Sequence, residues 1–337
     1  MQAGQNQIRT AARPHCLLCG SLGKELYHDL GDPYFGTPGL WSHKKCPQTN
    51  CGLVWLDPAP IEADLHLAYQ TYFTHGAEDG QPTFAAKLRS ALYSLYQGLQ
   101  SIPAALTGLG AAKKRMTLMF LDDLKPGKVL DVGCGDGKFL HRMRQLGWSV
   151  AGVDFDAKAV ANAKSIYGLD LHRGDLASAK FPDNSFDAVT MSHVIEHVPD
   201  PLALFTEARR ILKPGGRLVV TTPNNGSFGH EKFKGYWFGI DPPRHLNIYS
   251  LLTLAECARR TNLKVVNTLS TAANADIFIG GSFSIRDSAD HRTDAHPRPN
   301  PARILKTIAL QYRENSRLRT QPDCGEEAVL ICAKEGN

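Results

Sequence analysis

The chain has 337 residues, 42% of them hydrophobic, which is enough for one large core and a smaller module. Its 38 basic and 33 acidic residues give a net charge of +5, too small and too dispersed to indicate nucleic-acid binding by itself. Residues 1–14 are polar and contain no apolar core of a secretion signal, so we expect a cytoplasmic protein.

Four of the eight cysteines lie near the N-terminus in two close pairs. Cys16 and Cys19 form a CxxC pair, and four residues separate Cys46 from Cys51. In a cytosolic chain such pairs favour a tetrahedral zinc site over disulfides. Free buried cysteines are the alternative, because the second pair is wider than CxxC. We expect a closed structural zinc site in a module of residues 1–60, and scattered thiols at the other four positions.

Residues 62–125 favour helices and precede the first predicted strand of the larger core. Within them, Ser90 to Ala112 carries no charge and has the length of a membrane-spanning helix. Polar residues, glycines and Pro103 interrupt this segment, and its leucines recur at the spacing of one buried helix face. We therefore expect no transmembrane helix, and contact of residues 90–112 with a membrane surface remains an alternative.

From residue 128 onward, apolar runs alternate with segments of helical spacing. The predicted strands are 128–132, 149–153, 170–173, 186–191, 217–222 and 264–270, and the predicted helices are 136–146, 157–167, 201–212 and 250–261. This alternation predicts an α/β fold with a mostly parallel sheet and helices on both faces. We expect an insertion around residues 272–325, in which residues 286–303 form a mobile loop or a disordered segment.

A glycine-rich turn follows the first strand of this core, with the sequence Asp131-Val132-Gly133-Cys134-Gly135-Asp136-Gly137. A strand, a glycine turn and a helix in this order expose backbone N–H groups at a helix N-terminus, where a cofactor can approach closely. About twenty residues later, Asp154 ends the next predicted strand, where a carboxylate can bind ribose hydroxyls. The third glycine comes one position too early for the dinucleotide pattern GxGxxG, which argues against a nicotinamide oxidoreductase.

The DxGxGxG pattern resembles the first motif of class I S-adenosylmethionine (SAM) methyltransferases. Three later segments resemble this family in the same order, namely Gly174-Asp175-Leu176, residues 181–187 and residues 211–218. The resemblance implies a Rossmann-like sheet of seven strands, mostly parallel, with a last antiparallel strand at residues 327–334. It also implies a helical cap at 61–125 and a SAM-binding methyltransferase domain at 126–337.

The same resemblance implies how SAM is bound. The residues that it assigns to the methionine portion, the ribose, the adenine and the adjacent edge of the sheet are Asp131, Gly133, Cys134, Gly135, Gly137, Asp154, Phe155, Asp175, Leu176 and Ser192. Asp154 would bind the ribose hydroxyls, and Phe155 would pack against the adenine. Asp175 would accept a hydrogen bond from the adenine amino group, although a Gly-Asp turn needs no ligand to explain it.

The predicted fourth strand ends in Ser192-His193-Val194-Ile195-Glu196-His197, where an acceptor should lie. The string HxxEH is also the inverted zinc-protease pattern, but that motif needs a long helix, and Pro199 follows here. The segment resembles small-RNA 2′-O-methyltransferases and ubiquinone-pathway O-methyltransferases, which implies a second divalent metal at His193, Glu196, His197 and His245. Because His193 replaces a carboxylate, such a site would favour softer metals than magnesium.

A general base is the competing role for these histidines, with His197, His245 and His193 as the catalytic candidates. His245 lies in a PRHLxxxS segment, similar to segments in methyltransferases of sugar, polysaccharide and secondary-metabolite pathways. The aromatic residues 233–238 could form a wall of an acceptor pocket. The alternative for His245 is that it only ties its loop to the sheet through hydrogen bonds.

We therefore expect a SAM-dependent methyltransferase with a zinc module, acting on a small-molecule or carrier-linked acceptor. Oxygen is the favoured methylation site, and nitrogen or carbon remains open. One alternative is a metal-assisted RNA 2′-O-methyltransferase, which the dispersed charge disfavours. The other is a non-catalytic scaffold, which the intact glycines disfavour. The sequence predicts neither the acceptor nor the oligomeric state.

Overall fold

The computed structural model describes residues 8–69, 107–291 and 301–336. Their largest element is a seven-stranded sheet in the order β12-β13-β10-β9-β6-β7-β8. In chain order the strands are β6 (Lys128–Val132), β7 (Ser149–Asp154), β8 (His172–Arg173), β9 (Phe186–Ser192), β10 (Leu212–Pro223), β12 (Lys264–Thr271) and β13 (Glu327–Ala333). Only β13 runs antiparallel to its neighbours. The α/β class and the antiparallel last strand are confirmed.

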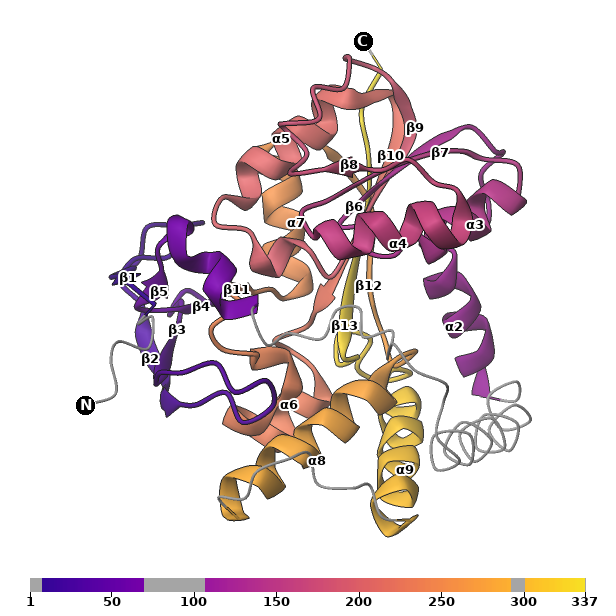
Figure 1. Cartoon of the computed structure of the whole chain (residues 1–337). Helices are drawn as coiled ribbons and strands as arrows, with labels where there is room; N and C mark the ends of the chain where they lie inside the picture. The colour runs from indigo at the N-terminus through magenta and orange to yellow at the C-terminus, as the bar shows by residue number, and fades with distance from the viewer. Residues whose placement is uncertain (1–7, 70–106, 292–300, 337) are drawn as a thin grey trace.

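Helices cover both faces of this sheet (Figure 1). Those that follow its strands are α3 (Lys138–Gln145), α4 (Ala157–Tyr167), α5 (Pro201–Ile211) and α7 (Leu251–Arg260), and α2 (Leu109–Thr117) precedes β6. Because side chains alternate along a strand, neighbouring residues of β6 enter different cores. Leu130 packs in the core that includes α5 and α7, whereas Val129 packs with Met116 of α2 and Met143 of α3.

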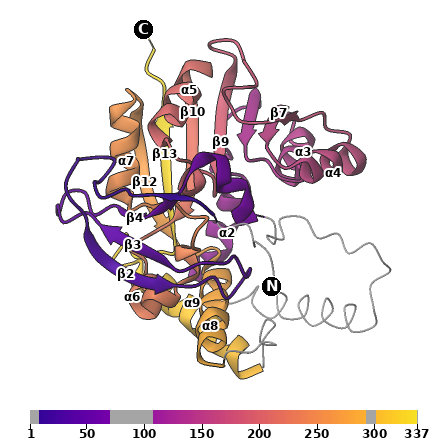
Figure 2. The same cartoon turned by 60° about the vertical axis from the view of Figure 1, so that its left-hand side comes forward.

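The N-terminal residues form a second, four-stranded sheet in the order β11-β4-β3-β2. Its strands are β2 (Lys24–Leu30), β3 (Trp41–Lys45), β4 (Val54–Leu56) and β11 (Asn247–Ile248), and a separate pair joins β1 (Thr10–Ala11) to β5 (Ala59–Pro60). Since β11 comes from the loop that also carries His245, the larger domain completes the sheet of the N-terminal module. Figure 2 shows this small sheet beside the large one.

The expected insertion is largely helical, which corrects one prediction. Helix α8 spans Ala275–His291 and α9 spans Pro301–Arg317, so residues 286–291 and 301–303 do not form a loop, and 292–300 lie outside the described residues. The sequence concealed α9 because its buried face is polar, with Thr307, Gln311 and Glu314 at helical spacing. Together with α6 (Phe228–Phe233), α8 and α9 lie near the carboxyl ends of the parallel strands (Figure 1).

The expected helical cap is only partly described. Residues 62–69 form the 3-10 helix η1 (Glu62–Tyr69), α2 covers 109–117, and residues 70–106 lie outside the described residues. Most of the uncharged segment 90–112 therefore lies outside the described residues. In the described parts of the chain, no helix combines the length and the apolar character needed to cross a membrane.

Two buried carboxylates meet where α9 approaches the start of β13. Oε1 of Glu314 accepts a 2.8 Å hydrogen bond from the backbone N–H of Glu326. Oε2 of Glu326 accepts from Trp237 Nε1 at 2.6 Å and from Ser227 Oγ at 3.0 Å. Glu314 Oε2 and Glu326 Oε1 have no hydrogen-bond partner among the described residues. Burial, followed by mutual repulsion, raises the pKa of Glu314, and burial also raises the pKa of Glu326.

This pair should make the fold less stable as the pH rises. An acid whose pKa is raised by folding stabilises the folded state while it is protonated, and this contribution is lost as the pH rises above the unfolded value of about 4.3. We expect the variant Glu326→Gln to gain unfolding free energy relative to the native chain at about pH 8, and to gain less at about pH 5. Urea unfolding at both pH values tests this, with the exposed Glu335→Gln as the control. An equal effect of Glu326→Gln at both pH values would contradict the assignment.

Candidate functional site

The turn between β6 and α3 requires its glycines. Gly133, Gly135 and Gly137 have φ angles of 69°, 53° and 76°, which side chains other than glycine rarely adopt. A Cβ at Gly133 would lie 2.5 Å from Val194 Cγ2, and one at Gly137 would lie 2.9 Å from Leu169 Cδ1. These glycines therefore leave the backbone of the turn uncovered by side chains of its own, directly before the N-terminus of α3.

Two aspartates, Asp131 of β6 and Asp154 of β7, lie beside this turn. The backbone N–H of Gly135 donates to Asp154 Oδ2 at 2.8 Å, so the carboxylate at the end of β7 fixes the turn directly. Thr190 donates to Asp131 Oδ1 at 2.6 Å. Burial, with a smaller effect of the charge on Asp154, raises the pKa of Asp131 to about 7. Asp154 thus holds the turn in place, and Asp131 lies beside it.

A pocket of about 490 Å³ opens over this turn, and we call it the glycine-loop pocket. The residues of the predicted SAM set that line it are Asp131, Gly133, Cys134, Gly135 and Ser192. The residues that sequence reasoning missed there are Thr117, Asp136, Lys138, Phe139 and Arg142. Four of these belong to α3 or to the turn itself, so their closeness to the glycines was the signal that could have identified them.

The other predicted SAM residues do not line this pocket. Gly137 and Asp154 support the turn from behind, and Phe155 is 66% exposed just beyond β7. Asp175 Oδ1 accepts from the backbone N–H of Ser178 at 2.7 Å, and Leu176 is buried in the main core. The roles of Phe155, Asp175 and Leu176 in adenine binding stay predictions.

Glu196, His197 and His245 form a second buried group, which we call the His–Glu cluster. One ligand atom of each residue lies within 4.8 Å of the others, although 47 or more residues separate His245 from the other two in the chain. The Nδ1 atom of His245 lies 2.8 Å from the carbonyl oxygen of Gly239, and Nδ1 of His197 lies 3.1 Å from that of Arg244. Donation from Nδ1 leaves each Nε2 with a lone pair for a proton or a metal.

Burial, followed by the charge of His245, lowers the pKa of His197 to about 4. Burial raises the pKa of Glu196, but the hydrogen bond to His193 has the larger combined effect with the nearby charges and lowers this pKa to about 2. Glu196 also accepts from Thr222 Oγ1 at 2.9 Å. The cluster therefore combines one anionic carboxylate with a neutral imidazole.

His193 lies beside this cluster but faces two carboxylates. Its Nδ1 is 3.2 Å from Glu196 Oε1, and its Nε2 is 2.9 Å from Glu327 Oε1. Burial lowers the pKa of His193, but the hydrogen bonds to the two carboxylates outweigh burial and raise it to about 10. A protonated imidazole cannot accept another proton, so this environment favours an ion-pairing role over that of a base or a metal ligand.

Sequence reasoning missed two further residues near the cluster. The Tyr69 hydroxyl lies 3.0 Å from His197 Nδ1, and its ring meets the ring of Phe155 edge to face. His43 of β3 is fully buried, and neither of its ring nitrogens has a hydrogen-bond partner in the described part of the chain. Of the aromatic residues 233–238, Phe233 and Trp237 pack in a core with Phe278, and their role at an acceptor pocket stays a prediction. No pattern in the sequence distinguishes Tyr69 or His43 from ordinary core residues.

A buried arginine joins the N-terminal module to the loop that carries His245. Arg244 is 0% exposed and forms ion pairs with Asp32, at 2.8 Å, and with Asp241. Its guanidinium also donates to Thr37 Oγ1 at 2.8 Å and lies over the ring of Phe35. Arg244 therefore links the module to the loop in addition to the pairing of β11 with β4.

The four N-terminal cysteines converge on one point. Their Sγ atoms all lie within 4.8 Å of one another, with 3.6 Å between Cys16 and Cys51 and 3.3 Å between Cys19 and Cys46. Zinc–sulfur bonds of about 2.3 Å in a tetrahedron place sulfur atoms about 3.8 Å apart. The described geometry therefore fits a four-cysteine zinc site.

The glycine turn lies within the part of the chain that resembles known methyltransferases. Residues 109–268 match a family model described as "Methyltransferase domain". Over 167 residues the chain is 35% identical to a probable S-adenosylmethionine-dependent methyltransferase of Mycolicibacterium smegmatis, a match that covers 46% of this chain and 61% of that protein. Over 111 residues it is 40% identical to the ubiquinone biosynthesis O-methyltransferase of Xanthomonas oryzae, covering 30% of this chain and 45% of that one.

Among solved structures, a SAM-dependent methyltransferase of Thermotoga maritima, described as a possible histamine N-methyltransferase, is similar at 19% identity with a TM-score of 0.45. That match covers 66% of this chain and 89% of the other. The chain spans only 45–61% of the length of the two curated relatives.

Proposed function

We propose that this chain, whose residues 109–268 match a methyltransferase domain, is a SAM-dependent methyltransferase with a structural zinc module. The glycine turn carries the proposal, because its three positive φ angles and its bond to Asp154 form a bare backbone surface beside two carboxylates. SAM supplies a methyl group on a sulfonium, which is already electrophilic. The chain has to hold that group, exclude water and orient the acceptor.

We assign the acceptor to small-molecule or carrier-linked metabolites with a hydroxyl group. The name of the Xanthomonas relative supports oxygen methylation over a partial stretch of the chain. In this proposal Nε2 of His245 or His197 accepts the hydroxyl proton while the oxygen attacks the methyl carbon. Burial keeps His197 neutral, and the charge of Glu196, which raises the pKa of His197, would favour the imidazolium that forms.

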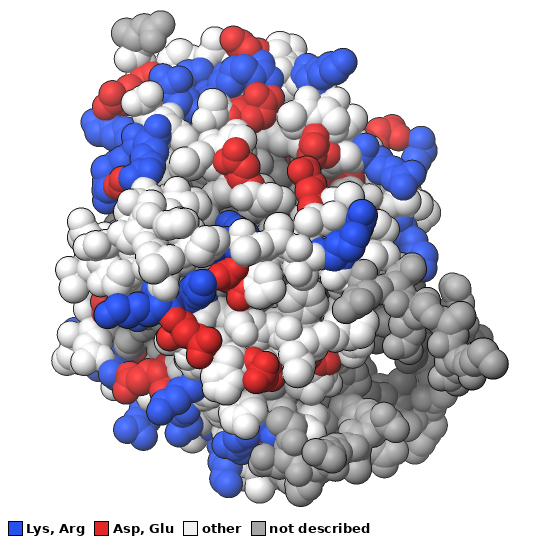
Figure 3. Space-filling model, turned by 90° about the vertical axis from the view of Figure 1, so that its left-hand side faces the viewer, with Lys and Arg blue, Asp and Glu red and all other residues white. Residues whose placement is uncertain are grey.

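A second candidate uses a metal ion in the His–Glu cluster. Two imidazoles and a carboxylate form a ligand set common for divalent transition metals, and both rings can donate Nδ1–H to backbone carbonyls. There the ion would lower the pKa of an acceptor hydroxyl. For an RNA acceptor the support is weaker, because Lys and Arg alternate with Asp and Glu on the face in Figure 3.

Separate His245→Ala and His197→Ala variants test the catalytic assignment. With an acceptor found by screening hydroxyl compounds for formation of S-adenosylhomocysteine, we expect at least one variant to lower kcat by about 100-fold. Its affinity for S-adenosylhomocysteine should be unchanged, as should the activity of the control His28→Ala, whose side chain is 70% exposed. Normal turnover in both variants would remove the histidines from the mechanism.

Metal analysis of the same variants separates the two candidates. A general-base enzyme should contain one zinc ion per chain, held by the cysteines, in the native protein and in His245→Ala. A metal-assisted enzyme should contain two ions per chain and lose one of them in His245→Ala. Since the cysteines and the His–Glu cluster form two separate groups of ligand atoms, loss of one ion from His245→Ala assigns that ion to the cluster.

A further inference from the structure

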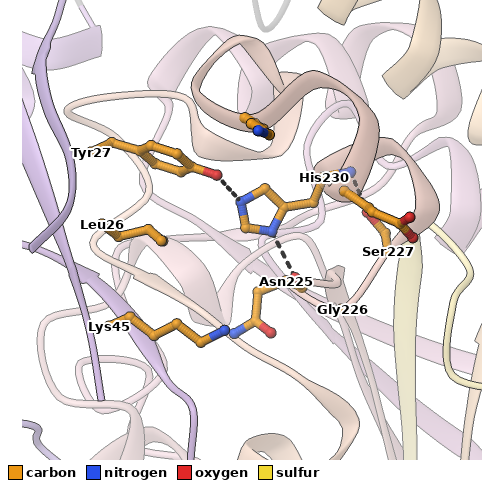
Figure 4. A pocket seen from close by; sticks show the side chains of 9 residues that line it. Leu26, Tyr27, Lys45, Asn225, Gly226, Ser227 and His230 are labelled. Carbon is orange, nitrogen blue, oxygen red and sulfur yellow. Dashed lines mark hydrogen bonds between the residues drawn. The ribbon is translucent and has the colours of Figure 1, made fainter. Parts of the chain in front are cut away.

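A second pocket, of about 510 Å³, lies between the N-terminal sheet and α6, and we call it the lysine pocket. Figure 4 shows residues from both sides converging on it. The residues on which the argument depends are Leu26, Tyr27, Lys45, Asn225, His230 and Lys234. None of them belongs to the glycine-loop pocket or to the His–Glu cluster.

The floor of the lysine pocket is rigid and neutral. Nδ1 of His230 lies 2.6 Å from the carbonyl oxygen of Asn225, and its Nε2 lies 3.0 Å from the Tyr27 hydroxyl (Figure 4). The imidazole is also stacked on Trp237, with ring centroids 4.7 Å apart. Burial lowers the pKa of His230, so this floor adds no charge. A ring or another flat apolar group can lie against Tyr27 and Leu26.

The rim of the lysine pocket carries positive charge without matching acids. In the register of β2 and β3, Lys45 stands directly opposite Lys24, and like charges in such a pair destabilise a sheet. Among the described residues, no ion pair neutralises Lys24, Lys45 or Lys234. Glu231 also lines the pocket, but it pairs with Arg317 at 2.8 Å. An anion bound at the rim would offset this repulsion.

Lys234 keeps its side chain at a backbone position that suits glycine. Its φ and ψ angles are 51° and −125°, a combination that residues with a Cβ rarely adopt. The adjacent Gly235 shows that the chain does place glycine in this turn. Strained backbone is typical of binding sites, because the surrounding structure must hold it for a purpose other than stability. A positively charged side chain that binds a ligand at this position would be such a purpose.

The lysine pocket lies at the same edge of the large sheet as the glycine turn. Asn225 comes two residues after the end of β10, and Thr221 of β10 pairs with Ser192, which lines the glycine-loop pocket. The four steps along the chain from Thr221 to Asn225 span about 13 Å at most in an extended chain. One ligand the size of a nucleotide could therefore reach both places.

We propose that the lysine pocket binds a phosphate-bearing part of the methyl acceptor, with Lys45 and Lys234 contacting the phosphate. The acceptor is then a carrier-linked metabolite whose carrier contains phosphate, with its reactive hydroxyl near Ser192. This inference rests on the proposed methyltransferase function. It assigns to Lys234 a binding role that accounts for its strained backbone.

Calorimetric titration of the full chain with pyrophosphate tests this proposal. We expect the native protein to bind pyrophosphate, and Lys45→Ala and Lys234→Gly each to weaken binding by at least about fivefold. The control Lys232→Ala, an exposed lysine of α6 outside the pocket, should stay within about twofold of the native affinity. Because glycine relieves the positive φ, Lys234→Gly should melt no lower than the native protein, so its loss of binding cannot come from unfolding.

S-adenosylhomocysteine is titrated into every variant in parallel. If the native protein does not bind pyrophosphate, or if all variants bind it equally, the proposal that the lysine pocket binds phosphate is wrong. Normal affinity for S-adenosylhomocysteine would then leave the proposed methyltransferase function intact. Absence of S-adenosylhomocysteine binding overturns the proposed function and with it the assignment of the pocket to a methyl acceptor.

Discussion

Replacement of Cys46 by serine is expected to release zinc and unfold the N-terminal sheet. The four sulfur atoms lie close enough to share one tetrahedral ion, and the strands around them are short, with β4 only three residues long. Structural zinc contributes about 10 kcal/mol or more to the folding of small modules, so this variant should have the largest effect of all the predictions. Metal analysis and the loss of cooperative unfolding measure it.

Two controls distinguish zinc binding from ordinary packing. Cys324→Ala removes a buried cysteine outside the cluster and should keep its zinc. Chelation of the native protein should reproduce the Cys46→Ser defect, and added zinc should reverse it. If Cys46→Ser retains a full equivalent of zinc, or if the native protein contains none, the four cysteines are free thiols.

The variant Arg244→Met is expected to lose about 3–5 kcal/mol of unfolding free energy, because it leaves two buried carboxylates without their cation. Asp32 and Asp241 are at most 8% exposed, so water cannot replace the guanidinium. Burial opposes ionisation, but hydrogen bonding and charge attraction from Arg244 lower the pKa of Asp32 below its usual value. Urea unfolding at neutral pH measures the loss.

The triple variant Arg244→Met, Asp32→Asn, Asp241→Asn should recover part of this stability, because it removes the unpaired charges together with the arginine. Arg244→Lys should also be destabilised, since an ammonium cannot replace a guanidinium that contacts two carboxylates. A loss below about 1 kcal/mol in Arg244→Met would show that the ion pairs do not hold the module on the loop.

Local patterns predicted the parts of the fold that depend on neighbouring residues. The glycine turn follows from three closely spaced glycines between a strand and a helix, and all three have the positive φ angles that glycine adopts readily. The strands followed from apolar runs, and the predicted helix 250–261 corresponds to α7, which Ser250 caps. In contrast, α9 was missed because its buried Gln311 and Glu314 conceal the usual apolar spacing.

Contacts between distant segments could not be predicted from the same patterns. Nothing local indicates that Asn247 and Ile248 pair with Trp55 and Val54, or that Tyr69 reaches His197. The sequence indicated that His197 and His245 could act together, but not that His193 would face Glu196 and Glu327. Such contacts depend on how the segment between β10 and α7, which carries His245, packs against the N-terminal module.

Calorimetric titration with S-adenosylhomocysteine tests the central claim most directly. We predict binding of one molecule per chain to the native protein and no binding of NAD. Asp154→Ala should weaken binding by at least about tenfold, because Asp154 fixes the Gly135 backbone and is expected to bind the ribose. No heat with S-adenosylhomocysteine and no shift in melting temperature would contradict the account.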